Sequence, residues 1–367
     1  MRYHTRRDFM QLMGIGTGLA MLDGSGSTHI AADDYQGPKL RIALVGLGNY
    51  ATYLAEGLKS SKYCRLTGIV TGTPGKAEKW KTQYNIPPKN IYNYQNFDQI
   101  KDNSDIDLVY IVLPNSMHKE FVIRTARAGK QVITEKPMAT SVKDCEEMIA
   151  ACAGAGVQLA VGYRLHYEPY HLELKRLGQE KVFGKVKLIE VSLGYRTTNP
   201  SEWRLKKALS GGGPLMNIGI YCVQASRYVT GEEPIAVTAQ FGPVTNKELF
   251  AEVEESITWQ LKFPGGAVAT SSSSYACSVD RFYAGAEKGF FELSPAVSYG
   301  PFRGRTSNGA LNFADINQQA MQMDEIAKPL LKKQKLPSHI SGEEGLKDLR
   351  VMEAIYKAAA TGREIIL

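Results

Sequence analysis

A glycine-rich turn after a short apolar run is the first segment of this sequence that could bind a phosphate. The run covers residues 39–45, the turn reads Gly-Leu-Gly-Asn-Tyr-Ala at 46–51, and a helix is expected at 53–59. Gly46 would allow a tight turn, Gly48 would let the backbone approach a pyrophosphate, and Ala51 would let the helix pack closely on the strand. Because the N–H groups at a helix start attract anions, the turn predicts a dinucleotide site. Its expected contacts are Gly46, Leu47, Gly48, Asn49 and Tyr50.

The end of the second expected strand, at 65–70, indicates which dinucleotide fits. An NAD site usually carries Asp or Glu there to bind the ribose hydroxyls. This sequence has Thr71, Thr73 and Lys76 instead, and no acidic residue before Glu78. A carboxylate repels a 2′-phosphate, whereas a hydroxyl and an ammonium attract it, so NADP is favoured over NAD. Taken alone, Lys76 is explained about equally well as a solvated lysine in the first turn of a helix.

Strands and helices alternate through the first part of the chain and would position this turn. Further strands are expected at 107–113, 130–134 and 157–161, and further helices at 75–84, 118–128 and 142–155. Apolar strands that alternate with amphipathic helices predict a parallel, doubly wound sheet covered on both faces. We therefore expect an α/β Rossmann domain at residues 38–161, with its ligand at the carboxyl ends of the strands.

The pattern changes from residue 162 onward. Strand-like runs at 185–195, 235–241, 255–263, 266–273, 280–284 and 290–293 are joined by turn residues, and helices are expected at 170–177, 215–228, 313–333 and 343–361. This arrangement predicts an α+β C-terminal domain at 162–367, with a mostly antiparallel open sheet and helices on one face.

Composition excludes several classes of protein. The 367 residues are 43% hydrophobic and 22% charged with a net charge of +7, which excludes a disordered chain, a collagen and a disulfide-rich mini-protein. The Lys and Arg residues are not clustered as nucleic-acid binding requires, so no nucleic-acid partner is expected. Five scattered cysteines without a Cys-x-x-Cys pair predict neither a disulfide framework nor a metal site.

Residues 1–32 are typical of an export signal. Arg6 and Arg7 precede Asp-Phe, an uncharged stretch runs from Phe9 to Leu22, and a polar exit follows. The paired arginines resemble the twin-arginine signal, which exports folded proteins and predicts a periplasmic location. The alternatives are a basic N-terminus before a short helix, or an apolar stretch that stays as an anchor. Beyond this segment, no run of about 20 apolar residues predicts a membrane span.

Two further segments carry a family resemblance. Glu135-Lys136-Pro137 follows the strand at 130–134, and the segment Ser-Gly-Gly-Gly-Pro-Leu-Met-Asn-Ile-Gly-Ile-Tyr occupies 210–221. Both resemble motifs of the Gfo/Idh/MocA superfamily (glucose–fructose oxidoreductase, inositol dehydrogenase and rhizopine catabolism). The second motif usually ends in His, and its Tyr ending is the form of the glucose–fructose oxidoreductase branch. The resemblance covers nearly the whole chain.

The resemblance implies roles for three residues. Lys136 would lie beside the nicotinamide and the reacting sugar carbon, and Tyr221 would be the acid/base. A free phenol titrates near ~10, and an ammonium within about 4–6 Å lowers that pKa, so the pair makes chemical sense. Taken singly, Lys136 is better explained by a salt bridge to Glu135, and Tyr221 by packing in a helix. Asn217 replaces the usual Asp, and Asn cannot accept a proton as a carboxylate does.

Other residues are expected around the same cleft. The expected cofactor contacts beyond the turn are Thr71, Lys76, Pro114, Asn115, His118, Glu135, Lys136, Arg164, Trp203 and Arg204. The expected substrate contacts are Lys136, Tyr163, His166, Asn217, Tyr221 and Tyr299. Arg204 is equally explained by a structural ion pair, and His166 by a structural role.

Together these features predict a periplasmic NADP-dependent sugar oxidoreductase. It would oxidise an aldose at C1 to the lactone and return the hydride to a second sugar carbonyl through a tightly bound cofactor. The resemblance also implies a dimer or tetramer formed through the C-terminal sheet. The alternatives are a sugar or cyclitol dehydrogenase with exchangeable NAD(P), an NAD-dependent glycosidase, and a non-catalytic sugar or nucleotide sensor, for which Asn217 is the only support.

Overall fold

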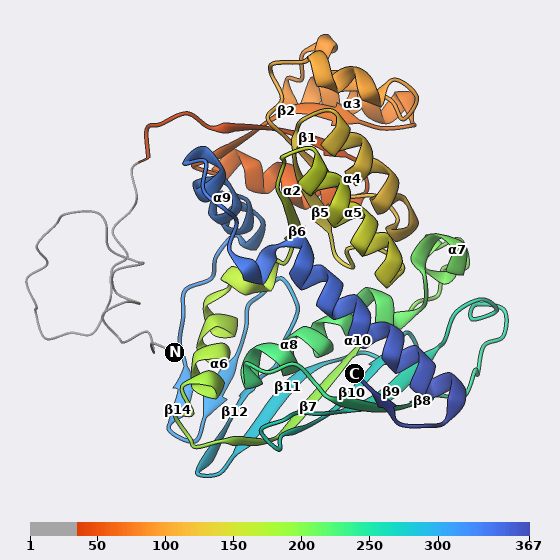
Figure 1. The fold of residues 1–367 in the computed structure, drawn as a ribbon, viewed down its shortest axis with the longest axis vertical. Coiled ribbons are helices and arrows are strands. Elements are labelled where there is room, and N and C mark those ends of the chain that lie inside the picture. The colour runs from red at the N-terminus through yellow and green to blue at the C-terminus, as the bar shows by residue number, and fades with distance from the viewer. Residues whose placement is uncertain (1–34) are drawn as a thin grey trace, which may run out of the picture. The chain divides into compact units, whose positions relative to one another are not determined.

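A parallel sheet of six strands forms the first layer of the fold (Figure 1). The computed structural model describes residues 35–367, so the predicted export signal lies outside the described residues. The sheet order is β3-β2-β1-β4-β5-β6, and every pair is parallel. Its strands are β1 (Leu40–Val45), β2 (Cys64–Val70), β3 (Ile91–Tyr92), β4 (Leu108–Ile111), β5 (Gln131–Glu135) and β6 (Leu159–Gly162). This is the doubly wound order of a dinucleotide-binding fold, as predicted.

Helices cover both faces of this sheet. In Figure 1, α2 (Asn49–Ser60) and α9 (Gln318–Leu331) lie on one side, and α4 (His118–Arg127) and α5 (Val142–Gly154) on the other. α3 (Pro74–Tyr84) begins with proline in its first turn, which suits a helix start. The packing of α9 on α2 was not predicted, because it joins segments more than 250 residues apart. Asp324 of α9 accepts hydrogen bonds from the Ser61 hydroxyl (2.5 Å) and the Tyr63 N–H (3.0 Å).

A second sheet of nine strands forms the other layer. Its order is β14-β13-β12-β11-β7-β10-β9-β8-β15, and only the β7–β10 pair is parallel. The strands are β7 (Val186–Gly194), β8 (Ala236–Phe241), β9 (Ser256–Lys262), β10 (Val268–Ser274), β11 (Val279–Ala286), β12 (Gly289–Leu293), β13 (Gly304–Thr306), β14 (Gly309–Leu311) and β15 (Ile365–Ile366). The mostly antiparallel sheet is confirmed. The sequence pattern missed β3, β13, β14 and β15, which have only two or three residues each.

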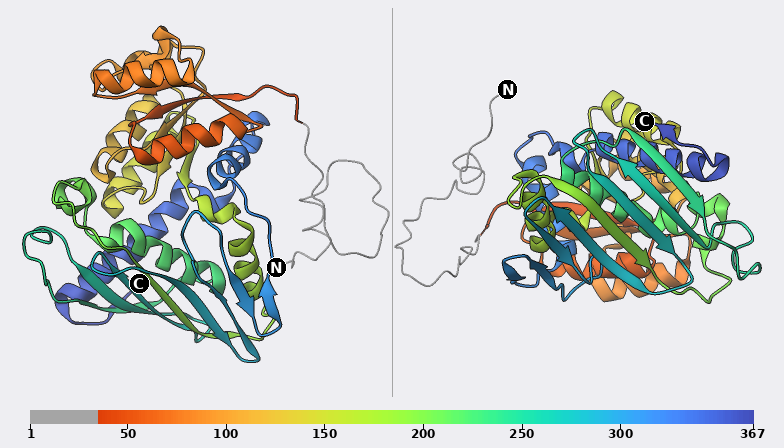
Figure 2. Two further views of the ribbon diagram at one scale, coloured as in Figure 1. Left: turned by 180° about the vertical axis from the view of Figure 1, so that it is seen from behind. Right: turned by 90° about the horizontal axis from the view of Figure 1, so that it is seen from below.

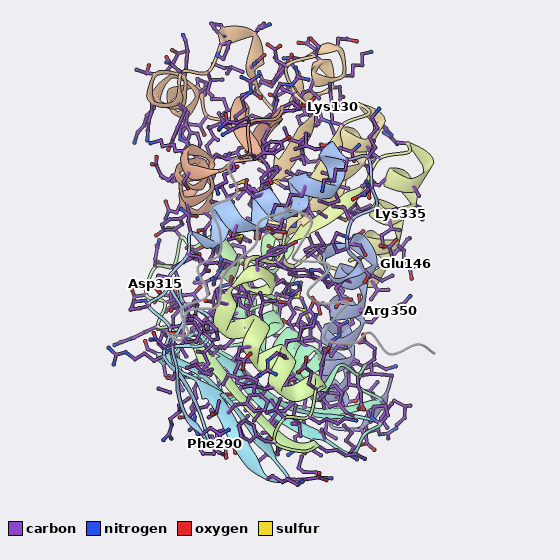
Figure 3. All side chains as sticks on the ribbon, turned by 90° about the vertical axis from the view of Figure 1, so that its left-hand side faces the viewer. Lys130, Glu146, Phe290, Asp315, Lys335 and Arg350 are labelled. Atoms are coloured by element: carbon purple, nitrogen blue, oxygen red, sulfur yellow. The ribbon has the colours of Figure 1, made fainter. Side chains whose placement is uncertain are left out.

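The helices of this layer lie on one face of the nine-stranded sheet. They are α6 (Pro169–Gln179), α8 (Ile220–Thr230) and α10 (Gly342–Thr361), while the short α7 (Lys207–Ser210) lies beside the sheet. Seen from below in Figure 2, no described helix covers the opposite face. Among the described residues, no helix is both long and apolar enough to span a membrane. Figure 3 shows Arg350 of α10 beside Glu146 of α5, and their side chains lie 3.4 Å apart, which links the two layers at the surface.

A buried charge network fixes α8 against α10. Arg227 of α8 is 3% exposed and donates to Asp348 (2.5 Å), Glu344 (2.8 Å) and Glu233 (2.7 Å). Asp348 is fully buried, and it also accepts hydrogen bonds from Tyr163 (2.6 Å) and Gln224 (2.7 Å). Burial raises the pKa of the Asp348 carboxyl, which Arg227 counters. The network therefore sets the position of α8, whose first turn carries Tyr221.

Arg227→Met should destabilise the fold because it leaves the buried Asp348 carboxylate without its cation. We expect a loss of about 3–5 kcal/mol in the free energy of unfolding, measured by urea denaturation. The double variant Arg227→Met/Asp348→Leu should recover much of that loss, since it removes both charges. A loss of under about 1 kcal/mol in the single variant would contradict a buried, interdependent pair.

Candidate active site

The carboxyl ends of β5 and β6 bring two cations together. The two strands are parallel neighbours in which Glu135 pairs with Gly162, so the residues that follow them, Lys136 and Arg164, lie at the same sheet edge. Tyr221, in the first turn of α8, reaches this edge and is only 8% exposed. Lys136 Nζ lies 4.4 Å from the centre of the Tyr221 ring, and the Arg164 guanidinium carbon lies 5.4 Å from it. The predicted proximity of Lys136 and Tyr221 is observed, and Arg164 is a second cation beside the phenol.

These charges decide the acidity of Tyr221. Burial alone would raise the pKa of the phenol, but the positive charges of Arg164 and Lys136 outweigh burial and hold that pKa below 10. A phenol with a lowered pKa exchanges a proton near neutral pH more readily than a free tyrosine does. The site therefore contains a candidate acid/base group.

Arg164 also anchors a loop of the second layer. Its guanidinium donates to the Ser298 carbonyl (3.0 Å), the Val297 carbonyl and the Gln318 side chain, and it is 4% exposed. The same group lies 4.4 Å from the ring of Tyr299, which in turn packs on Tyr53 of α2 at 5.1 Å. Arg164 was expected to contact the cofactor. In the structure it joins Tyr221 to the loop that carries Tyr299, and its contact to a cofactor stays a prediction.

Glu135 is a buried carboxyl beneath this site. It is 8% exposed, and it accepts a hydrogen bond from the Tyr110 hydroxyl, which itself accepts one from Gln322 (2.6 Å). Burial raises the pKa of Glu135 to about 7, although Tyr110 and Lys136 oppose the shift. The alternative of a Glu135–Lys136 salt bridge is not observed, because Lys136 Nζ donates to the Asn217 carbonyl (2.8 Å).

Asn217 contributes its backbone and its side chain to different partners. It lies in a π-helical turn, Leu215–Gly219, and not in the regular helix predicted for 215–228. Its carbonyl holds Lys136, while its side chain donates to the Tyr195 hydroxyl (3.0 Å) and accepts from Arg204 (3.3 Å). A π-helical turn is frequent at functional sites, because it redirects one side chain out of the helical register.

Some residues that shape this side of the site were not predicted from the sequence. Tyr195 and Tyr275 follow β7 and β10, which are parallel neighbours, so the two rings meet at 5.0 Å. Two aromatic residues at the ends of two strand-like segments were a usable signal, but only if the parallel pairing had been known. Glu254 was also missed. It accepts from the Gly213 (2.9 Å) and Leu215 (3.2 Å) N–H groups and so fixes the start of the π-helical turn.

Arg204 and Trp203 lie next to Asn217, on a short 3-10 turn. Arg204 pairs with Glu202 (2.8 Å) and lies over the Trp203 ring at 4.4 Å. The ion pair considered for Arg204 is therefore present, together with its contact to Asn217.

Several predicted ligand contacts have other partners in the structure. The Tyr163 hydroxyl donates to Asp348 (2.6 Å), and the ring is 1% exposed. His118 is fully buried between the Leu113 (2.9 Å) and Pro137 (3.0 Å) carbonyls. Both side chains were predicted to touch a ligand, and in the structure their polar atoms have partners within the protein.

Of the other predicted contacts, Asn115 and His166 have partners within the protein, and Tyr50 lies near Tyr221. Asn115, which follows Pro114 in the loop after β4, is 6% exposed and donates to the Ser210 carbonyl (2.8 Å), so it joins the two layers. His166 stacks on Tyr163 at 4.6 Å. Tyr50 does reach the site, because its phenol interacts electrostatically with Glu135, Arg164 and Tyr221.

The turn after β1 fits the phosphates of a dinucleotide. Gly46 has a φ of +91°, and a Cβ there would lie 2.5 Å from the Val112 carbonyl oxygen. At Gly48 a Cβ would meet nothing within 4 Å, so space is open in front of the turn. No side chain caps the start of α2 and no acidic residue stands in its first turn, which leaves its N–H groups available to an anion. Leu47 is buried beneath the turn, and Asn49 is exposed.

The end of β2 keeps the chemistry predicted for it. The Thr71 hydroxyl is buried and accepts from the Thr73 N–H (3.2 Å). Lys76 is exposed, and within residues 35–367 it has no acidic partner. The end of β2 is thus followed by a buried hydroxyl and by an exposed ammonium that has no acidic partner among the described residues.

Glu135→Gln should change how stability depends on pH. A folded-state pKa raised from 4.5 to about 7 means that the folded protein holds a proton that the unfolded chain has lost. The stabilising contribution is complete below about pH 4.5 and is lost as the pH rises through about 7, a change of about 3 kcal/mol. Urea denaturation of wild type and variant across this range should show the wild type losing stability relative to Glu135→Gln. Parallel curves would refute the burial of an ionisable carboxyl here.

Replacing the two glycines of the turn by alanine should affect different properties: Gly46→Ala the stability, and Gly48→Ala the binding of a dinucleotide. Gly46→Ala should cost about 1–3 kcal/mol, because it combines a positive φ with a clash. Gly48 has an ordinary φ of −88°, so Gly48→Ala should keep the stability but weaken dinucleotide binding about tenfold or more, since its Cβ would block the pyrophosphate. Urea denaturation and fluorescence titration with NADPH measure the two effects. Unchanged binding in Gly48→Ala would argue against phosphates at this turn.

Comparison with known proteins agrees with this geometry. The family model for an oxidoreductase family with an NAD-binding Rossmann fold, GFO_IDH_MocA, matches residues 40–163, and the model of the family's C-terminal domain matches 171–292. The crystal structure of aldose-aldose oxidoreductase from Caulobacter crescentus, complexed with glycerol, is 42% identical with a TM-score of 0.87, over 90% of this chain and 100% of that chain.

Two curated relatives are more distant. The D-xylose 1-dehydrogenase [NADP(+)] of Haloarcula marismortui is 28% identical over 337 residues, which is 88% of this chain and 91% of the relative. The inositol 2-dehydrogenase of Rhizobium meliloti is 24% identical over 210 residues, 57% of this chain and 61% of the relative. The chain thus belongs to the Gfo/Idh/MocA family of NAD(P)-dependent oxidoreductases.

Proposed function

We propose that the chain is an NADP-dependent sugar oxidoreductase that oxidises an aldose at C1 and reduces the carbonyl of a second sugar. The observation that carries the proposal is the buried Tyr221 phenol beside Lys136 and Arg164, at the carboxyl edge of a Rossmann sheet. Lys136, Tyr221 and Asn217 are the proposed reaction-centre residues. Hydride transfer at a carbinol carbon requires a group that handles the hydroxyl proton, and Tyr221 is placed to do so.

In this proposal the protein residues move and hold the proton. A bound nicotinamide dinucleotide would supply the hydride acceptor in the first half-reaction and the hydride donor in the second. Tyr221 Oη takes the proton of the C1 hydroxyl and later returns a proton to the carbonyl oxygen of the second sugar. Lys136 and Arg164 stabilise the phenolate that takes the first proton and that forms again when the second sugar is reduced; between the two steps Tyr221 is the neutral phenol.

The relatives support a sugar as the substrate. The aldose-aldose oxidoreductase and the D-xylose 1-dehydrogenase are named for aldoses, and both match about nine-tenths of this chain. NADP is supported by the absence of an acidic residue at the end of β2, between Thr71 and Lys76, and by the NADP(+) in the name of the xylose dehydrogenase.

We also propose where and how the protein works. The paired arginines at positions 6 and 7 support export of the folded protein to the periplasm, with the cofactor already bound. A cofactor held through both half-reactions would suit a compartment without a soluble nicotinamide pool. The face of the nine-stranded sheet that no described helix covers supports assembly into a dimer or tetramer.

A second candidate is a sugar dehydrogenase with an exchangeable cofactor. The similarity to D-xylose 1-dehydrogenase favours it, because that relative aligns along most of both chains. The two candidates differ in whether the dinucleotide remains bound after purification.

Absorbance of the purified protein after exhaustive dialysis tests the proposal. We expect a retained nicotinamide band that grows near 340 nm when an aldose is added and falls again when a second sugar is added. Tyr221→Phe should keep the bound dinucleotide but slow both changes by about 10²–10⁴-fold, because it removes the proton carrier. A nucleotide-free protein that turns over only with added NADP would favour the second candidate. A Tyr221→Phe variant of normal rate would exclude Tyr221 as the acid/base.

A further inference from the structure

A cavity of about 130 Å³ lies inside the second layer, and residues of α6, α8 and the nine-stranded sheet line it. Most of its wall is apolar and includes Leu165, Leu174, Val191, Phe282 and Leu293. An apolar cavity of about 150 Å³ in another protein holds a benzene molecule, so this cavity has room for a small organic ligand. Leu172 of α6 lines it and is 48% exposed, so the cavity reaches the surface beside α6.

The cavity touches the candidate active site through one side chain. Tyr221 lines it, but neither Lys136 nor Arg164 does. The cofactor turn, Tyr299 and Asn217 are also absent from its wall, although Ala296 and Val297 of the loop that carries Tyr299 line it. The cavity is therefore a separate space behind Tyr221, and it shares the phenol ring with the proposed reaction centre.

One polar atom in the cavity wall lacks a partner. His166 Nε2 is buried and has no hydrogen bond, whereas its Nδ1 lies 3.3 Å from the Tyr228 hydroxyl. The ring cannot turn freely to find a partner, since it is stacked on Tyr163 at 4.6 Å and meets Tyr228 edge-on at 4.3 Å. His171, which also lines the cavity, has both ring nitrogens occupied by Glu168 (2.7 Å) and the Ala296 carbonyl (2.7 Å). An unpaired buried nitrogen is costly and indicates a missing partner.

A cation stands near the same end of the cavity. Lys175 of α6 is half-buried, lines the cavity, and has no carboxylate within 4.0 Å among the described residues. Glu344 interacts electrostatically with Lys175, but this carboxylate is already paired with Arg227 (2.8 Å) and Lys347 (3.5 Å). Lys175 Nζ also lies 5.5 Å from the Tyr228 ring, on the side of the His166 contact. The positive charge is thus available to an anion.

We propose that this cavity binds a small carboxylate with an apolar body. Its carboxylate would accept hydrogen bonds from Lys175 Nζ and from His166 Nε2, with Tyr228 donating to His166 Nδ1. Its apolar body would pack against Leu174, Phe282 and the ring of Tyr221. A ligand held there contacts the proposed acid/base from behind, without entering the cleft of the sugar and the dinucleotide.

Calorimetric titration of the purified full chain with benzoate tests this site directly. Benzyl alcohol, which is similar in size but neutral, serves as the control ligand. We expect benzoate to bind at least about tenfold more tightly than benzyl alcohol. Because binding itself is measured, the result does not depend on the proposed sugar reaction.

Two variants test separately whether benzoate binding needs the positive charge of Lys175 and whether it needs the empty volume of the cavity. Lys175→Met should weaken benzoate binding about tenfold or more and leave benzyl alcohol unaffected. Ala225→Leu fills the cavity from α8 and should abolish binding of both ligands while Lys175 remains. Lys185→Met removes an exposed lysine outside the cavity and should change nothing.

The proposal fails if benzoate does not bind wild type at millimolar concentration, or if it binds no better than benzyl alcohol. It also fails if benzoate binds Ala225→Leu as tightly as wild type, because the ligand would then occupy another site. Circular dichroism of each variant shows whether a loss of binding comes from a loss of folding. If Ala225→Leu does not fold, Lys175→Met alone tests whether benzoate binding depends on the positive charge.

Discussion

The chemistry of this structure depends on two cations held against one buried phenol without a carboxylate to neutralise them. Lys136 donates to the Asn217 carbonyl, and Arg164 donates to two backbone carbonyls and to the Gln318 amide. All these acceptors are neutral, and within residues 35–367 neither cation forms a salt bridge. The nearby acid, Glu135, has a pKa raised to about 7 by burial, so near neutral pH it is partly protonated. The positive charge of the cluster therefore acts on Tyr221.

The fold supplies this arrangement through the adjacency of two strands and the rigidity of one helix. Since β5 and β6 are in parallel register, Lys136 and Arg164 emerge together, and Gly162 leaves room for the Glu135 carboxylate. A Cβ at Gly162 would lie 2.5 Å from Glu135 Oε1. Tyr221 is held from the other side, because Arg227 and Asp348 fix α8 to α10. The buried pair of Arg227 and Asp348 thus positions the site, whereas the two cations of the site, Lys136 and Arg164, are not paired with a carboxylate among the described residues.

Sequence patterns predicted what depends on local periodicity and on short motifs. The parallel sheet, the glycine turn and the open second sheet follow from segments of fewer than 15 residues, whereas the closeness of Lys136 to Tyr221 was implied by the family resemblance. Contacts between distant segments could not be read in this way. The Tyr163 hydroxyl is taken by Asp348, 185 positions away, and α9 returns to the first sheet through Asp324. The hydrogen-bond partners of His118 are backbone carbonyls. Every residue has a backbone carbonyl, so the residue types in the sequence could not indicate these partners.

Asn217 shows how a departure from a motif can keep the contacts that hold a site together. The carboxylate expected at this position would lie beside Arg204, and its negative charge would offset the field that lowers the pKa of Tyr221. Asparagine keeps the two contacts that the geometry requires, a backbone carbonyl for Lys136 and an amide for Tyr195 and Arg204, and adds no charge. The substitution thus removes a proton acceptor but strengthens the positive field at Tyr221. It therefore gives no support to a non-catalytic sensor, since the group that would carry the proton is the phenol and not residue 217.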